Sequence, residues 1–186
     1  MQRVIRVCCD NDIKIAGDKP SVDIKRNRLA NGDTAKPNSE RVQWAKKIGR
    51  EVAEKFINDA NTQSENTGDY NMLLQRRLLL SFTATVGFEQ YIEDDTLSGM
   101  AQKSFLDTLK KNNSELYKSS SDTGAFSFYY LAYRRGQDTE RRMGQTFAML
   151  CSHDGDPIFQ ELGEALYCWF SSVVRKTVSQ FQDINA

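Results

Sequence analysis

The chain has 186 residues, which is enough for one substantial hydrophobic core. Its 25 basic side chains balance its 25 acidic ones, so no overall charge favours nucleic acid or an anionic membrane as a partner. No run of residues is apolar enough to span a bilayer, and the first residues lack the apolar stretch of an export signal. We therefore expect a cytoplasmic protein without a membrane segment, whose four cysteines are reduced thiols.

Residues 1–37 differ in composition from the rest of the chain. They contain two of the three prolines, and apolar and polar residues alternate over the short segments 4–7, 13–15 and 22–24. Such short strands cannot form an independent sheet. We expect an N-terminal arm, extended or partly β, that packs on another surface.

Residues 38–186 show the three- and four-residue apolar spacing of amphipathic helices. The first predicted helix follows residue 38 and ends at the polar stretch 61–68. The second begins after Asp69, a suitable N-cap, and extends to about Ile92. Its middle is apolar on nearly every side, which predicts that this helix lies at the centre of the fold.

The third predicted helix begins after Asp95, which is a suitable N-cap. The run of acidic residues around Asp95 lies at a helix junction, where capping explains it. Residues 110–121 are weakly patterned and are expected to be partly loop. Asp122 then precedes an aromatic-rich helix over residues 124–135, whose rings we assign to the core.

The last two helices have clear boundaries. Gly136 is suited to the end of the aromatic-rich helix and Asp138 to the N-cap of the next. Asp156 as N-cap and Pro157 as first helical residue mark the start of the final helix. The sequence thus predicts an all-α fold, a bundle of about six helices over residues 38–186 preceded by the arm.

One candidate site surrounds the single histidine of the chain. A thiol, an imidazole and two carboxylates lie within six positions, and these groups can bind a metal or form a catalytic pair. The residues are Cys151, His153, Asp154 and Asp156. The favoured interpretation is structural, with an aspartate capping a helix, His153 in a solvated loop and Cys151 in the core. We expect no bound cofactor.

A second candidate site consists of four arginines on either side of the predicted helix–helix corner. They are Arg134, Arg135, Arg141 and Arg142. Arginine in the first turn of a helix is unfavourable to the helix dipole, which indicates an anionic partner. The alternative is that nearby acidic residues pair with these arginines on a solvated surface.

Patterns typical of enzymes are missing from the sequence. There is no phosphate-binding P-loop, no dinucleotide-binding fingerprint and no nucleophile elbow. The leading hypothesis is therefore a non-enzymatic helical protein that acts through protein–protein contact, including self-association through residues 1–37. The alternatives are a module that binds an anionic ligand or nucleic acid at the arginine corner, and a metal-dependent enzyme centred on the His153 loop.

Overall fold

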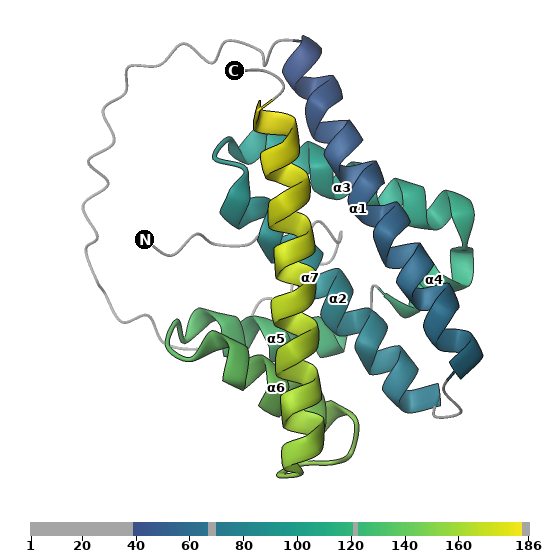
Figure 1. The fold of residues 1–186 in the computed structure, drawn as a ribbon, viewed down its shortest axis with the longest axis vertical. Coiled ribbons are helices and arrows are strands. Elements are labelled where there is room, and N and C mark those ends of the chain that lie inside the picture. Colours follow the sequence, from purple (N-terminus) through teal and green to yellow (C-terminus); the bar gives the residue numbers. More distant parts are fainter. Residues whose placement is uncertain (1–38, 67–69, 121–122, 184–186) are drawn as a thin grey trace, which may run out of the picture. The chain divides into compact units, whose positions relative to one another are not determined.

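The computed structural model describes residues 39–66, 70–120 and 123–183, and every regular element in these ranges is an α-helix (Figure 1). The all-α prediction is confirmed, whereas the arm expected over residues 1–37 lies outside the described residues. The helices are α1 (Ser39–Asn66), α2 (Tyr70–Tyr91), α3 (Asp95–Asn112), α4 (Ser114–Ser119), α5 (Thr123–Arg134), α6 (Thr139–Leu150) and α7 (Pro157–Asp183).

Helix α2 lies at the centre of the described helices. Every residue from Leu78 to Phe88 is buried, and α2 contacts each of the other six helices. Figure 1 shows α7 passing across it. The sequence predicts this arrangement correctly, because a helix without a polar face is stable only where other helices surround it.

Two helix pairs pack especially closely, and each has a glycine at the contact. A Cβ atom on Gly49 of α1 would overlap the carbonyl oxygen of Ala101 on α3. A Cβ atom on Gly144 of α6 would overlap the carbonyl oxygen of Gln160 on α7 in the same way. The backbones can approach this closely only because these positions have no side chain.

A charged contact joins three of the helices away from these crossings. Arg76 of α2 donates two hydrogen bonds to Asp59 of α1, from Nε to Oδ2 at 3.0 Å and from Nη2 to Oδ1 at 2.7 Å. The guanidinium carbon of Arg76 also lies 5.9 Å from the ring centre of Trp169 on α7. Both charged side chains are largely buried, so the bidentate geometry supplies the hydrogen bonds that they lose from water.

The helix count differs from the expected six because residues 110–121 contain a further helix. Asn113 adopts an extended conformation that ends α3, and its side chain accepts a hydrogen bond from the Leu116 nitrogen at 2.9 Å to begin α4. Leu116 is buried and anchors this six-residue helix. A helix of six residues is too short to show an apolar period in the sequence.

Several predicted helix ends are correct and others are wrong. Asp156 caps α7 by accepting a hydrogen bond from the Ile158 nitrogen, and Gly136 has a positive φ of 73°. Asp138 precedes α6 as expected, but its left-handed backbone leaves its carboxylate without a capping bond. Helix α1 continues through the first polar residues after position 60, since a helix already packed along one side tolerates a polar last turn.

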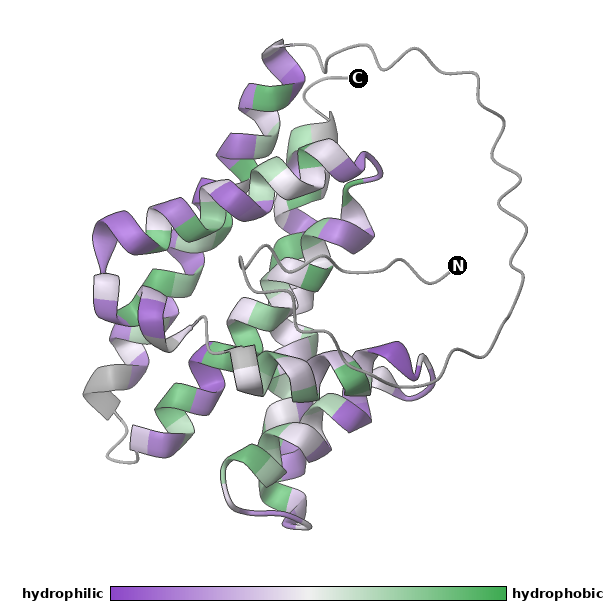
Figure 2. Ribbon diagram, turned by 180° about the vertical axis from the view of Figure 1, so that it is seen from behind, coloured by the Kyte–Doolittle hydropathy of each residue, from purple (hydrophilic) through white to green (hydrophobic). Residues whose placement is uncertain are grey.

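Figure 2 shows hydrophilic and hydrophobic residues in alternating bands along most helices, the pattern of helices that bury one side. Among the described helices, none combines the length and the apolar character required to cross a membrane. The caps expected at Asp69 and Asp122 lie outside the described residues.

Replacing Gly49 with alanine should destabilise the fold, because the new methyl group would force α1 and α3 apart. We expect the free energy of unfolding to fall by about 1–3 kcal/mol, the usual cost of overpacking. Urea denaturation followed by circular dichroism measures this change.

The matched control for this substitution is Gly99→Ala on α3, where an added Cβ meets no atom within 4 Å. That variant should be stabilised by about 0.5–1 kcal/mol, since alanine restricts the unfolded chain more than glycine does. Equal effects of the two substitutions would contradict the proposed role of Gly49.

Candidate functional site

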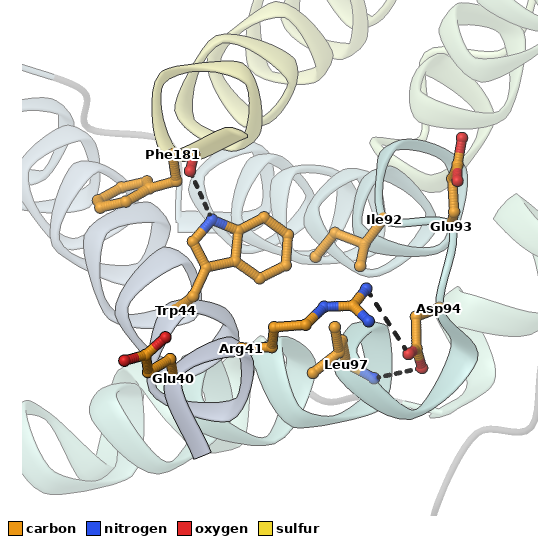
Figure 3. A pocket seen from close by; sticks show the side chains of 8 residues that line it. All are labelled: Glu40, Arg41, Trp44, Ile92, Glu93, Asp94, Leu97 and Phe181. Carbon is orange, nitrogen blue, oxygen red and sulfur yellow. Dashed lines mark hydrogen bonds and ion pairs between the residues drawn. The ribbon is translucent and has the colours of Figure 1, made fainter. Parts of the chain in front are cut away.

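A pocket of about 360 Å³ lies where the start of α1, the α2–α3 junction and the end of α7 meet (Figure 3). The residues that line it are Glu40, Arg41, Trp44, Ile92, Glu93, Asp94, Leu97 and Phe181. Ile92 and Leu97 are fully buried, and Figure 3 shows Trp44 facing Ile92 across the pocket. The pocket combines an apolar interior with a charged edge.

Trp44 joins the two ends of the helical region at this pocket. Its indole nitrogen donates a hydrogen bond of 2.9 Å to the main-chain carbonyl oxygen of Phe181, near the end of α7. The ammonium group of Lys47, one turn further along α1, lies 4.9 Å from the centre of the Phe181 ring. The hydrogen bond holds the Trp44 ring against α7, and the Lys47 contact is a second link between α1 and α7.

The two carboxylate oxygens of Asp94 have different roles. One caps α3 at the α2–α3 junction, and the other lies at the charged edge of the pocket. Its Oδ1 accepts hydrogen bonds from the main-chain nitrogens of Thr96 at 2.9 Å and Leu97 at 3.2 Å, and so caps α3. Its Oδ2 lies 3.9 Å from Nη2 of Arg41. The sequence places a cap in this acidic run, but it assigns the cap to Asp95, which is one residue too far along the chain.

Helix α5 presents apolar side chains on two opposite faces. Phe126, Tyr129 and Tyr133 surround the ring of Phe82 on α2, with ring centres 5.6–6.2 Å away. The assignment of this aromatic segment to the core is correct for Tyr129, which is fully buried, whereas Phe126 and Tyr133 are half-buried. Phe128 and Leu131 lie on the outer face, 49% and 60% exposed. Their three-residue spacing makes them neighbours on the helix surface.

The four arginines of the corner do not have equivalent environments. Arg134, Arg135 and Arg141 are exposed, and the guanidinium carbon of Arg134 lies 5.6 Å from the ring centre of Tyr130. Arg142 is partly buried, and its Nη1 is fully buried with no hydrogen-bond partner in the described structure. The corner thus contains one guanidinium nitrogen whose hydrogen-bonding capacity is unused.

The four residues around the histidine are used separately. Cys151 is buried, Asp156 caps α7, and Asp154 is exposed. The exposed ring of His153 stacks on Phe159, with ring centres 3.8 Å apart. Within residues 39–66, 70–120 and 123–183, no three histidine, cysteine, aspartate or glutamate side chains come together as potential metal ligands.

Three tyrosines and one cysteine lie near one another where α5 and α7 each pack on α2. Burial raises the pKa of Tyr167 well above its usual range, with smaller contributions from Tyr133, Tyr91 and nearby acidic groups. The Tyr91 hydroxyl is 2.9 Å from that of Ser171, within hydrogen-bonding distance. Burial also raises the pKa of the Cys168 thiol, and the carboxylates of Glu140 and Glu164 raise it further. The Tyr167 hydroxyl and the Cys168 thiol therefore stay protonated at neutral pH, which favours a structural role for both.

Substitutions of Asp94 separate its two contacts. Asparagine can still cap α3, so Asp94→Asn loses only the distant Arg41 pair, and the free energy of unfolding should change by less than about 1 kcal/mol. Asp94→Ala also loses the cap and should destabilise the protein by about 1 kcal/mol more. Thermal denaturation compares the two variants, and equal stability would exclude the capping role.

The raised pKa predicts slow alkylation of Cys168 at mildly alkaline pH, because the thiolate is the reacting species. Glu164→Gln removes a carboxylate that disfavours the thiolate, so the pKa should fall and the rate of iodoacetamide labelling should rise about two- to threefold. Peptide mass spectrometry distinguishes Cys168 from the other thiols. The exposed Glu161→Gln on the same helix should leave the rate unchanged.

The sequence does not identify the pocket, because Trp44 and Phe181 lie 137 positions apart. The one sequence feature at the pocket is the acidic run at residues 93–95, and helix capping is sufficient to explain that run. No protein-family model, curated protein or solved structure matches this chain.

Proposed function

We propose that this protein acts through contact with other proteins, including a second copy of itself, and that the outer face of α5 takes part in the contact. The observation that carries the proposal is the exposure of Phe128 and Leu131 side by side on one helix. The cytoplasm remains the compartment that we expect for this activity.

Both side chains have a reason to be buried by a partner. Removing a phenylalanine or leucine side chain from water contributes roughly 1.5–3 kcal/mol when burial is complete. The opposite face of α5 already packs on α2, so the helix has a fixed orientation before any partner arrives. A preorganised apolar surface loses less entropy on binding than a mobile one.

The charge of α5 supports contact with a partner that is apolar and acidic. The helix contains no acidic residue and ends at Arg134, which is followed by the exposed Arg135. Arginine beside aromatic side chains is characteristic of protein interfaces. A partner surface with a carboxylate next to an apolar patch would complement this arrangement.

Binding of an anion at the corner of Arg134, Arg135, Arg141 and Arg142 is the second candidate function. The specific observation in its favour is the buried Nη1 of Arg142, which has no hydrogen-bond partner. A phosphate oxygen is a strong acceptor for a guanidinium group, and the Arg142 side chain has to move outward to offer Nη1 to it. Salt-sensitive binding of inorganic phosphate that is lost in Arg142→Met would support this alternative.

Native mass spectrometry of the full-length chain tests self-association. We expect a multiple of the chain mass, and we expect Phe128→Ser combined with Leu131→Ser to shift the population toward the single chain. Removal of residues 1–37 tests the other expected surface. If those residues bridge two copies, the truncated protein should contain fewer chains per assembly than the full-length protein, and it should keep its helical content.

The matched control is Ile158→Ser, since Ile158 is an apolar side chain on α7 that is 72% exposed. The Ile158→Ser variant should have the same number of chains per assembly as the wild-type protein. Circular dichroism should give the same helical content for every variant. A wild-type chain that stays single at all concentrations tested excludes self-association. An assembly unaffected by the α5 substitutions excludes that face as the contact.

A further inference from the structure

We propose that the pocket at the start of α1 binds a small uncharged molecule in which a primary carboxamide is attached to one aromatic ring. This inference concerns a different part of the molecule from α5 and does not depend on the protein contact proposed above. It follows from the apolar interior of the pocket and from two polar side chains at its edge, Arg41 and Asp94, that lie beyond hydrogen-bonding distance of each other.

The interior of the pocket suits a flat apolar group. Ile92 and Leu97 form part of its lining and are fully buried. The indole of Trp44 is held by its hydrogen bond to Phe181, so one wall of the pocket is an aromatic surface. A ligand ring can pack against this indole in an offset or edge-on arrangement. A volume of about 360 Å³ lies near the lower limit for small-molecule pockets, which favours a ligand with a single ring.

Arg41 and Asp94 place a hydrogen-bond donor beside an acceptor at the edge of the pocket. Nη2 of Arg41 lies 3.9 Å from Oδ2 of Asp94, which is too long for a hydrogen bond. In the part of the chain that the structure describes, neither the Arg41 guanidinium nor Oδ2 of Asp94 makes a hydrogen bond. Figure 3 shows the Arg41 side chain extending from α1 toward the Asp94 carboxylate. The two groups therefore suit a ligand that offers an acceptor to Arg41 and a donor to Asp94.

A primary carboxamide carries the acceptor and the donor that this pair requires. Its oxygen accepts a hydrogen bond from Arg41 and its nitrogen donates one to Oδ2 of Asp94, both from one planar edge. Oδ1 of Asp94 remains bound to two main-chain nitrogens of α3, so the helix keeps its cap. An exposed ion pair at 3.9 Å contributes little by itself, so the two side chains can turn to the ligand at little cost.

The other two carboxylates that line the pocket take no part in this recognition. Figure 3 shows the carboxylates of Glu40 and Glu93 pointing away from the Arg41 guanidinium and the Asp94 carboxylate. The groups left to contact the polar end of a ligand are one guanidinium and one carboxylate, whose charges are opposite and equal. An uncharged ligand with a donor and an acceptor matches them better than an ion of either sign.

Three ligands of nearly equal shape test this assignment, namely benzamide, benzoate and benzamidinium. Benzamide has both an acceptor and a donor on its polar edge, whereas benzoate has acceptors only and benzamidinium has donors only. Benzoate would turn an oxygen toward Asp94, and benzamidinium would turn an N–H group toward Arg41. Each ion therefore loses one of the two hydrogen bonds, and we expect it to bind at least about threefold more weakly than benzamide.

The two tryptophans of the chain provide the readout. In a nitrogen-15 correlation spectrum of the full-length protein, each indole N–H gives one signal, and Trp169→Phe assigns them. Titration with benzamide should shift the Trp44 signal to saturation and leave the Trp169 signal unchanged. The same titration with benzoate and with benzamidinium gives the order of the three affinities.

Substitutions of Arg41 and Asp94 should change which ligand binds most tightly. Asp94→Asn keeps an oxygen for the α3 cap and replaces Oδ2 by an amide nitrogen, so benzoate should become the tightest ligand. Arg41→Met removes the donors and leaves Oδ2 of Asp94, so benzamidinium should become the tightest ligand. The matched control is Glu93→Gln, at a lining carboxylate that points away from both groups, and it should keep the wild-type order. An unchanged Trp169 signal reports that each variant is folded.

Three results would overturn the proposal. One is a Trp44 signal that does not respond to benzamide or shifts no more than the Trp169 signal. Another is binding of benzoate or benzamidinium by the wild-type chain that is as tight as that of benzamide, which would indicate an ion site or a purely apolar pocket. The third is the wild-type order of affinities in both Asp94→Asn and Arg41→Met, which would show that these side chains do not contact the ligand.

Discussion

The burial of α2 on all sides is the constraint on which the other helices depend. A buried helix must satisfy its polar side chains without water, and the two threonines in the middle of α2 do so within the helix itself. The hydroxyl of Thr83 donates to the carbonyl oxygen of Leu79 at 2.8 Å, and that of Thr85 donates to the carbonyl oxygen of Ser81 at 3.1 Å. These bonds require nothing from neighbouring helices, so the surroundings of α2 can be apolar. Gln75 is the exception, since its buried Oε1 has no partner within the described structure.

The two close helix pairs around α2 share one feature, a glycine at the crossing. Gly49 lets α1 approach α3, and Gly144 lets α6 approach α7. The α1–α3 pair presents an aromatic ring to the central helix, since the ring centre of Phe105 on α3 lies 6.0 Å from that of Phe88 on α2. Close pairs surrounding a buried helix also explain why the functional candidates lie at helix ends and on outer faces, where packing leaves side chains accessible.

Much of this arrangement follows from local patterns in the sequence. The apolar stretch of α2 predicts its central position, and the Asp156–Pro157 pair predicts the start of α7, because both signals depend on neighbouring residues. The close crossings are not predictable in this way, since a glycine inside a helix does not reveal its partner. Gly49 and the exposed Gly99 have the same local character, yet only Gly49 meets another backbone.

The candidate sites show the same division. The sequence identifies Cys151, His153 and Asp156 as neighbours in the chain, but each side chain faces different surroundings in the fold. The pocket needs residues from three helices and from the α2–α3 junction, and the sequence shows only its acidic run. The sequence assigns Phe128 to the core with the other aromatic residues of α5, because helical spacing does not show which face of the helix is covered. In the fold Phe128 is exposed.

The hydrogen bond between Trp44 and Phe181 has a kinetic consequence. It closes a loop of 137 positions, and closing so long a loop is entropically costly until the intervening helices have packed. A chain still being synthesised lacks Phe181 until almost all of the described helices exist. The pocket at the start of α1 therefore forms only when α7 has docked, and any ligand that it holds would recognise the completed fold and not a folding intermediate.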